Sequence, residues 1–196
     1  MTNHAAQRLR VFPNCVQGFT LVELLVVIAV ITLSITMIAP AMANFMQDNR
    51  LASQLNALTS SLLYARNAAT ARQADVVLCP SADGVACSGG ADWETGWIIF
   101  VDADGDRRAD IGEDRLRHRQ ALSGGNTIES NVRRTALRYS PTGRASSISF
   151  WICDSRGSAK AVGITLGTHG RPYALNDANG NGTKDYGSRN RDVSCP

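Results

Sequence analysis

The sequence contains neither a phosphate-binding P-loop nor a dinucleotide-binding fingerprint, the glycine-rich motifs that hold nucleotide phosphates. It has only three histidines, and neither His118 nor His169 has a Ser or Cys nucleophile beside it in the sequence. These absences argue against nucleotide-dependent enzymes and against hydrolases with a histidine-activated nucleophile. We therefore expect no catalytic activity, and no cofactor apart from the calcium ion considered below.

Charged residues are also absent from Leu24 to Gln47, a run of apolar and small residues. A span of this length can cross a hydrocarbon core of about 30 Å as one tilted helix. Pro40 lies inside the run and should kink or locally unwind the helix, because its ring removes one backbone donor. Glu23 directly precedes the run. A charge near the centre of a membrane helix costs about 2.5 to 3.5 kcal/mol, so this carboxylate needs a partner or a function.

An ordinary secretory signal is one interpretation of this region. Arg8 and Arg10 would form its positive part, and Leu21–Ala39 its apolar part. Ala41-Met42-Ala43 would then be the cleavage site, leaving a soluble periplasmic binding module that starts at Asn44. The apolar part of such signals usually runs about 7 to 15 residues and has no reason to hold a Glu, so we prefer a retained helix.

The six residues from Gly18 to Glu23 read Gly-Phe-Thr-Leu-Val-Glu and open the apolar run. They resemble the class III signal of type IV pilins and type II secretion pseudopilins. The resemblance implies cleavage between Gly18 and Phe19 by prepilin peptidase, and N-methylation of Phe19. It also implies that Glu23 neutralises the amino terminus of a neighbouring subunit during assembly. The α-amino group of Phe19 formed by cleavage would carry positive charge, because its reference pKa is about 7.7 to 8.0. Glu23 would lie in the first helical turn, where the helix dipole favours an anion.

We expect four segments along the 196 residues: a leader (1–18), a transmembrane and assembly helix (19–43), an amphipathic helix (44–73) and a β-rich head domain (74–196). The amphipathic part is indicated by apolar residues at three- and four-residue steps, which form one stripe for packing on a sheet. The stripe consists of Leu51, Leu55, Leu58, Leu62, Ala65 and Ala69.

Beyond Ala74 the helical pattern gives way to short β-rich runs separated by turn residues. The expected strands are Asp75–Cys79, Trp97–Val101, Leu116–Ala121, Thr127–Ser130, Ala136–Tyr139, Ser147–Cys153 and Lys160–Leu166. Seven short strands after one long helix predict an antiparallel sheet domain and an α+β fold. We expect Trp93 and Trp97 to anchor its core.

Three segments resemble the GspH/FimT branch of the pilin superfamily: residues 78–81 (Leu-Cys-Pro-Ser), 96–102 (Gly-Trp-Ile-Ile-Phe-Val-Asp) and 168–172 (Thr-His-Gly-Arg-Pro). The resemblance covers most of the chain, whereas residues 176–186 look like an insertion. It implies a pilin fold, with the long helix packed on the antiparallel sheet of the head. It also implies a minor pilin, held in the inner membrane by a single span with its head in the periplasm, which assembles with other pilins into a type IV pilus. The alternative is a minor pseudopilin of a type II secretion system.

Five cysteines are present, of which Cys15 lies in the leader. The other four are Cys79, Cys87, Cys153 and Cys195, an even number in a domain expected outside the cytoplasm, where disulfides persist. Three pairings are possible. We predict that Cys79 with Cys87 closes a short loop, and that Cys153 with Cys195 ties the carboxyl terminus to a strand. A metal site is the competing interpretation, but no Cys-x-x-Cys spacing occurs and the histidines are not near the cysteines in sequence.

Five acidic residues have the spacing of an EF-hand-like calcium loop. They are Asp102, Asp104, Asp106, Asp110 and Glu113, at places one, three, five, nine and twelve. The match has a defect, because the sixth place needs Gly and is Arg107, whereas Gly105 comes two residues early. A second loop, residues 177–182, matches at places one, three, five and six but has Ser188 in place of the final acid. Plain solvated turns are the competing interpretation of both loops.

Members of the FimT group are associated with DNA uptake through a Gly-Arg-x-Arg motif near the carboxyl terminus. The corresponding segment here is residues 170–173, in which Arg171 is present and Tyr173 replaces the second arginine. Arg189 and Arg191 would restore the lost charge if the carboxyl-terminal disulfide folded them alongside Arg171. The resemblance then implies salt-sensitive, sequence-independent affinity for double-stranded DNA. The competing interpretation is that these arginines are simply solvated.

Overall fold

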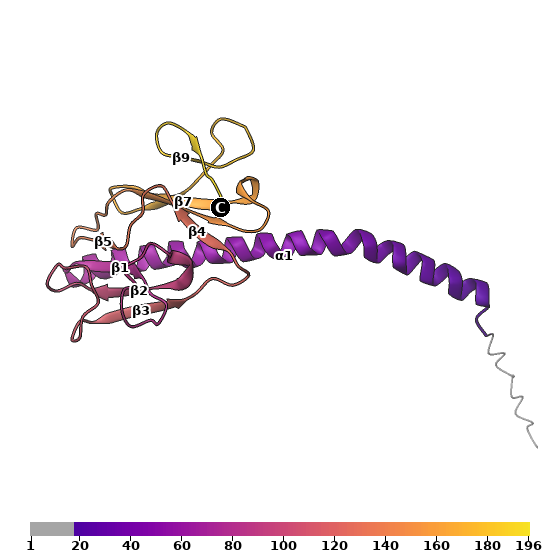
Figure 1. The fold of residues 1–196 in the computed structure, drawn as a ribbon, viewed down its shortest axis with the longest axis horizontal. Coiled ribbons are helices and arrows are strands. Elements are labelled where there is room, and N and C mark those ends of the chain that lie inside the picture. Colours follow the sequence, from indigo (N-terminus) through magenta and orange to yellow (C-terminus); the bar gives the residue numbers. More distant parts are fainter. Residues whose placement is uncertain (1–17) are drawn as a thin grey trace, which may run out of the picture. The chain divides into compact units, whose positions relative to one another are not determined.

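The computed structural model describes residues 18–196 (Figure 1), so the leader up to residue 17, with Cys15, lies outside the described residues. The chain divides into two units, with the boundary between Ala43 and Asn44. Helix α1 (Leu21–Arg72) contributes its first part to the amino-terminal unit and its remainder to the head unit. We describe each unit by itself.

The amino-terminal part of α1 begins with a capped turn. The side-chain oxygen of Thr20 accepts a hydrogen bond from the backbone N–H of Glu23 at 3.2 Å, as an N-cap residue does. The helix then continues through Pro40 without interruption. We expected a kink or local unwinding at this proline, and of these two the unwinding is not seen. Loss of one donor removes one intrahelical hydrogen bond and leaves those of the adjacent turns in place.

In the head unit α1 carries the predicted apolar stripe. Five of its six members are fully buried: Leu51, Leu58, Leu62, Ala65 and Ala69. Leu55 is half-buried and packs against the same core. The helix ends after Arg72, and Gln73 follows with a φ of 53°, the left-handed conformation common just beyond helix ends. The periodicity prediction is confirmed.

The head contains two four-stranded antiparallel sheets where we expected one. The first sheet runs β3 (Arg115–Gln120), β2 (Gly96–Val101), β1 (Val76–Pro80) and β5 (Leu137–Tyr139) in spatial order. The second runs β4 (Thr127–Ser130), β6 (Ile148–Cys153), β7 (Val162–Leu166) and β8 (Pro172–Ala174). A two-stranded ribbon follows, of β9 (Asp185–Tyr186) and β10 (Arg191–Asp192). Single 3-10 turns lie at η1 (Trp93–Thr95) and η2 (Ser158–Lys160).

All seven predicted strands exist, within two residues at each end. The strands that we missed are β8, β9 and β10, which have two or three residues each. Runs this short carry no alternation of apolar and polar residues, so their pairing is decided by tertiary contacts that local sequence does not encode.

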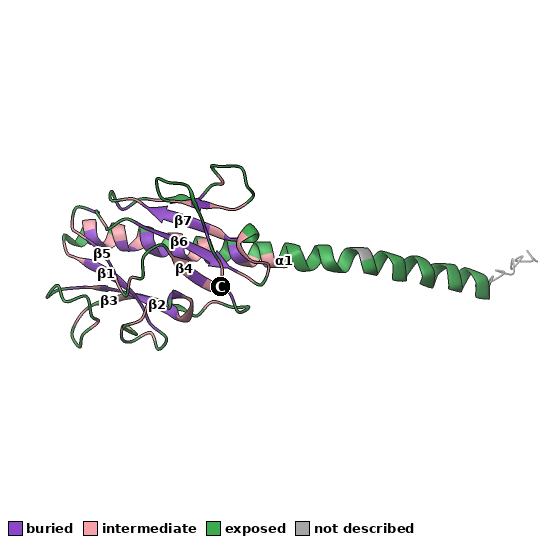
Figure 2. Cartoon of the chain, turned by 45° about the horizontal axis from the view of Figure 1, so that its top comes forward, coloured by how far each residue is buried: buried purple, intermediate pink, exposed green. Residues whose placement is uncertain are grey.

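Both sheets bury one face against α1 (Figure 2). In β6, Ile148, Phe150 and Ile152 belong to this central core, while the alternate residues face the opposite side of the sheet. The expected tryptophan anchors are confirmed: Trp93 and Trp97 are both fully buried. The Trp93 ring meets Phe150 edge-on with centroids 5.3 Å apart, and its indole N–H donates to a backbone carbonyl, which satisfies the one polar atom of the side chain.

The outer faces of both sheets are also covered. On the first sheet, a small core of Val77, Cys79, Ile98 and Phe100 lies beneath the loops that carry Cys87 and Ala109. On the second, Trp151 and Cys153 pack with Val193 and Cys195 from the end of the chain. Central strands β1 and β6 are therefore buried on both faces, whereas the edge strand β3 is polar and exposed, with a sequence that disfavours pairing with another sheet.

The turn at Gly170 provides a test of how tightly the head is packed. Gly170 has a φ of 70°, and a Cβ there would overlap the carbonyl oxygen of Gly143 and lie 2.9 Å from the ring of Tyr139. We expect Gly170→Ala to lower the free energy of unfolding by about 2 kcal/mol or more, measured by urea unfolding of the full chain in detergent.

The matched control is Gly180→Ala. Gly180 has a similar φ of 77°, but among residues 18–196 nothing lies within 4 Å of a Cβ built on it. Its substitution should cost only the backbone strain of a left-handed alanine, about 1 kcal/mol. Equal losses for the two variants would show that the Gly170 turn is not packed against the loop after β5.

Candidate functional site

The first turn of α1 holds the residues that we assigned to processing and assembly. Gly18 and Phe19 precede the helix and are exposed, with Phe19 at 83% of its full accessible surface. Thr20 and Glu23 have the Ser/Thr-x-x-Glu spacing of a capping box, a signal that our sequence reasoning missed. Side chains on a helix point back toward its amino end. The Glu23 carboxylate therefore belongs to the surface around the helix start, where a cation is its natural partner.

The amino-terminal part of α1 has no polar face to turn toward water. From Gly18 to Met46, every residue whose burial the structure describes is exposed, and an 18-residue window has a mean hydropathy of 2.7 (Figure 2). The helix is long and apolar enough to cross a membrane. An exposed surface of this kind marks a place that lipid or another protein covers.

Two disulfides fasten segments that lack strands of their own. Cys79 at the end of β1 is bonded to Cys87, with Cα atoms 5.5 Å apart, and Cys153 at the end of β6 is bonded to Cys195, with Cα atoms 5.8 Å apart. These are the pairings that we expected. Near the second bond, the indole N–H of Trp151 donates to the carbonyl of Ser194 at 2.9 Å, which further holds the carboxyl terminus on the sheet.

The acidic loop between β2 and β3 brings together only part of the set that its spacing suggested. Carboxylate oxygens of Asp102, Asp104 and Asp106 all lie within 4.8 Å of one another. Glu113 instead accepts hydrogen bonds from the backbone N–H groups of Ala103 (2.9 Å) and Asp110 (3.2 Å), so it joins the two ends of the loop. The structure therefore forms a three-carboxylate cluster rather than the full twelve-residue arrangement.

Asp102 differs from its two exposed neighbours because it is buried, with only 3% of its surface exposed. One oxygen accepts the N–H of Gly105 at 2.9 Å, and the other, Oδ2, is buried without a hydrogen-bond partner among the described residues. Burial raises the pKa of Asp102. The N–H groups of Gly105 and Arg107 oppose this shift, and the charges of Glu113 and Asp104 add to it.

The second acidic loop, residues 177–182, is hydrogen-bonded within itself. The carboxylate of Asp177 accepts the backbone N–H groups of Gly180, Asn181 and Gly182. These bonds, that of Gly182 foremost, lower the pKa of Asp177. The buried carboxylate of Asp185 likewise accepts N–H groups from the start of the loop. The carboxylates of this loop thus already have protein donors.

Comparison with known proteins shows which family the chain belongs to. A model of the family described as type II transport protein GspH matches residues 54–170, which include most of the head. The chain belongs to the GspH family. A model of the prokaryotic N-terminal methylation motif matches residues 13–39, the segment that holds Gly18, Phe19 and Glu23. This GspH-family chain is thus a minor pilin or pseudopilin, a structural subunit that assembles with other pilins, and the motif with the apolar helix indicates membrane anchoring.

Solved structures share the fold. The type IV minor pilin FimU of Pseudomonas aeruginosa is 21% identical, and the match covers 67% of this chain and 92% of FimU with a TM-score of 0.54. A second crystal form of FimU gives a TM-score of 0.52. The minor pseudopilin EpsH of Vibrio cholerae is 11% identical over 66% of this chain and 98% of EpsH, with a TM-score of 0.46. No curated protein matches the sequence significantly.

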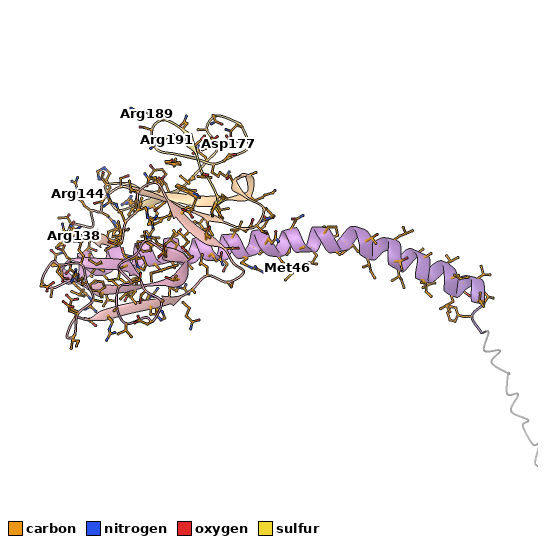
Figure 3. All side chains as sticks on the ribbon, in the orientation of Figure 1. Met46, Arg138, Arg144, Asp177, Arg189 and Arg191 are labelled. Atoms are coloured by element: carbon orange, nitrogen blue, oxygen red, sulfur yellow. A yellow bond between two sulfur atoms is a disulfide. The ribbon has the colours of Figure 1, made fainter. Side chains whose placement is uncertain are left out.

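The three arginines proposed for DNA lie in two places of this GspH-family head. Arg171 is in the turn between β7 and β8, directly after Gly170, which packs against Gly143. Arg189 and Arg191 belong to the carboxyl-terminal ribbon, where the guanidinium of Arg191 lies 4.9 Å from the centre of the Tyr186 ring. In Figure 3 these two arginines are in the carboxyl-terminal loops, apart from Arg138 and Arg144.

A cavity of about 290 Å³ gathers four other arginines that sequence reasoning did not single out. They are Arg107, Arg134, Arg138 and Arg144. Arg138 is paired with Asp75 at 2.7 Å, and the Nε of Arg134 is buried without a hydrogen-bond partner in the part of the chain that the structure describes. Sequence spacing could not predict this group, because Arg107 comes from the β2–β3 loop, Arg138 from β5, and Arg134 and Arg144 from the segments on either side of β5.

A matched pair of variants can show which disulfide contributes more to the free energy of unfolding. Cys153 and Cys195 are 42 residues apart, and Cys79 and Cys87 are 8 apart. In the chain-entropy model, replacing both cysteines of the longer loop by Ser should cost about 1.5 kcal/mol more unfolding free energy than the same change in the shorter loop. Urea unfolding of both double variants measures the difference. Equal or reversed costs would show that loop entropy does not set the ranking.

Proposed function

We propose that this chain is a minor pilin of a type IV pilus. It is made as a precursor, cut by prepilin peptidase between Gly18 and Phe19, and methylated on Phe19. The apolar part of α1 then holds it as a single span in the inner membrane, with the head in the periplasm, until it joins the filament. The observation that carries the proposal is an exposed apolar helix with one carboxylate, Glu23, in its capped first turn.

Two environments suit the exposed part of α1. In the membrane, lipid covers its side chains, and in a filament the corresponding helices of neighbouring subunits do so. Glu23 is costly in both unless it meets a positive charge. The α-amino group of Phe19 on a neighbouring subunit supplies that charge after cleavage, because it is protonated near neutral pH. Cleavage and assembly are thus linked through one ion pair.

The alternative machine is a type II secretion system, in which the chain would be a minor pseudopilin. The fold likeness to FimU, a type IV minor pilin, supports the pilus, whereas the family description supports secretion. Both use the same cleavage and the same assembly helix. Recovery of the protein with sheared surface pili would support the pilus. Its absence there, together with a secretion defect in a deletion strain, would support the alternative.

Binding of double-stranded DNA is a second candidate function. The arginine cavity favours it, because guanidinium groups bind phosphate oxygens in a bidentate manner and four arginines line this cavity. The turn that carries Arg171 packs against the loop before Arg144, so Arg171 extends the same basic surface. Contacts of this kind give affinity for the phosphate backbone without reading the base sequence.

Processing and assembly can be tested separately. The mature protein should begin with N-methyl-Phe19, and Gly18→Glu should leave uncut precursor in the membrane; intact-mass spectrometry of purified protein distinguishes them. A mature chain starting at Asn44 would overturn the proposal.

Glu23→Gln should be cut and inserted normally, because loss of the charge eases insertion, but it should be depleted from purified filaments. Glu23→Asp is the matched control, since it keeps the charge and should retain part of the incorporation. If Glu23→Gln enters filaments as well as the parent does, Glu23 has no part in assembly.

DNA binding can be assigned to one surface by two double variants of exposed arginines. Arg138→Ala with Arg144→Ala should weaken binding to unrelated duplexes about equally, and should lower the slope of log affinity against log salt by about 0.9 per lost phosphate contact. Mobility-shift titration of the full chain at low salt measures both.

Arg189→Ala with Arg191→Ala is the matched control, and its effect should be smaller. If this control loses more DNA affinity than the Arg138 and Arg144 double variant, the binding site lies in the carboxyl-terminal ribbon instead. If the parent shows no shift at high micromolar protein, DNA binding fails and the assembly role stands alone.

A further inference from the structure

We propose that the head binds a calcium ion at Asp102, Asp104 and Asp106, at the start of the β2–β3 loop. Their carboxylate oxygens lie within 4.8 Å of one another, close enough to share one cation. Like charges held this close repel unless something positive lies between them. The proposal rests neither on the DNA-binding role nor on the assembly role.

The buried carboxylate of Asp102 is the observation that points to a ligand. Asp102 is 3% exposed, and its Oδ2 is buried and makes no hydrogen bond within residues 18–196. A buried carboxylate oxygen without a hydrogen bond is costly, so such groups are normally paired or bound to a metal. Arg107 and Arg108 follow the cluster in sequence, yet neither forms a salt bridge with Asp102 in the described part of the chain. A cation bound at the cluster would supply the missing partner.

At one place the backbone of the loop has the conformation that an EF-hand-like site needs. The sixth place, which normally requires Gly, is Arg107, and Arg107 has a φ of 65°. The missing glycine is therefore no obstacle, because an arginine adopts the same left-handed conformation. Glu113 holds the ends of the loop together through the N–H groups of Ala103 and Asp110, and so positions the cluster without belonging to it.

Calcium fits these ligands better than other common ions. All candidate donors are carboxylate oxygens, which suit hard cations and disfavour zinc, whose structural sites use Cys and His. Calcium accepts six to eight oxygens in irregular geometry and takes water for the rest, whereas magnesium demands a near-ideal octahedron. Asp102 and Asp104 also line a surface hollow of about 540 Å³, which leaves room for the water ligands.

The loop at residues 177–182 is the weaker candidate for a cation site, because its carboxylate oxygens already have hydrogen-bond partners. Its acidic residues Asp177 and Asp185 accept backbone N–H groups on their carboxylates. A cation there would have to displace bonds that already satisfy these oxygens. The two loops therefore provide an internal comparison within one chain.

The experiment is isothermal titration of the full chain in detergent, after metal removal by chelator, with calcium and then magnesium chloride. We expect one calcium ion per chain, with a dissociation constant of about 10⁻⁴ to 10⁻³ M, as in other extracellular calcium modules, and weaker binding of magnesium. Calcium should also raise the melting midpoint, because it binds the folded state.

Asp104→Asn with Asp106→Asn should abolish saturable binding and the calcium-dependent rise in the midpoint. Both residues are exposed, and Asn can still accept the N–H groups of Asp106 and Arg108 that these carboxylates accept now. The metal-free midpoint should therefore match that of the parent. If the double variant does not fold, Asp104→Asn alone is measured in its place.

Asp110→Asn is the matched control: it lies in the same loop and is also exposed, but it stands outside the cluster, so binding should be unchanged. The proposal is overturned if the parent shows no saturable calcium binding, or if the double variant binds like the parent. It is equally overturned if Asp110→Asn loses binding as fully as the double variant, or if only Asp177→Asn loses it.

Discussion

Burial of the α1 stripe from Leu51 to Ala69 is the interaction on which the head depends. The inner faces of both sheets meet this one surface, so the central core shared by the two sheets depends on the helix. Each fully buried leucine contributes about 1.5 to 3 kcal/mol relative to an exposed one, which makes the stripe the largest single source of apolar contact along α1. Alanines at its end, Ala65 and Ala69, keep the helix close to the strands. The amino-terminal part of the same helix is apolar too, but it is exposed. A helix that is buried in the head at one end and exposed at the other suits a subunit of an assembly better than an independent globular protein.

The outer faces of the sheets are covered by a different means. Loops and the end of the chain lie over them, and on each sheet one covering segment is joined by a disulfide to a central strand, through Cys79 in β1 or Cys153 in β6. A disulfide needs no secondary structure in the segment that it holds, because it acts mainly by limiting the unfolded chain. Segments with irregular structure can therefore vary in sequence while the double-sided burial of β1 and β6 is kept. The acidic cluster lies in one of these loops, between β2 and β3.

Sequence alone predicted the features that depend on neighbours along the chain. The stripe follows from a period of 3.6, the seven strands follow from short β-rich runs between turn residues, and the pilin signal is a contiguous motif. Prediction from the sequence failed where segments distant along the chain come together. Arg107 and Arg144 are 37 residues apart and line one cavity, which no local pattern shows. Glu113 had the right spacing for a ligand, yet backbone N–H groups of its own loop capture its carboxylate. The division into two sheets was missed because it depends on which strands pair, as β4 does with β6, and local sequence does not encode that pairing.

Arg107 connects the two candidate sites of the head. It follows Asp106 of the acidic cluster directly, and its side chain lines the arginine cavity. Without a cation, the three carboxylates lower the positive potential around this guanidinium and so weaken any anion bound in the cavity. A bound calcium ion would cancel most of that negative charge and fix the loop that sets the position of Arg107. Because binding free energies are reciprocal, a phosphate in the cavity would then favour calcium in the loop to the same degree. The two sites would act as one charge-coupled surface, although their side chains come from different parts of the fold.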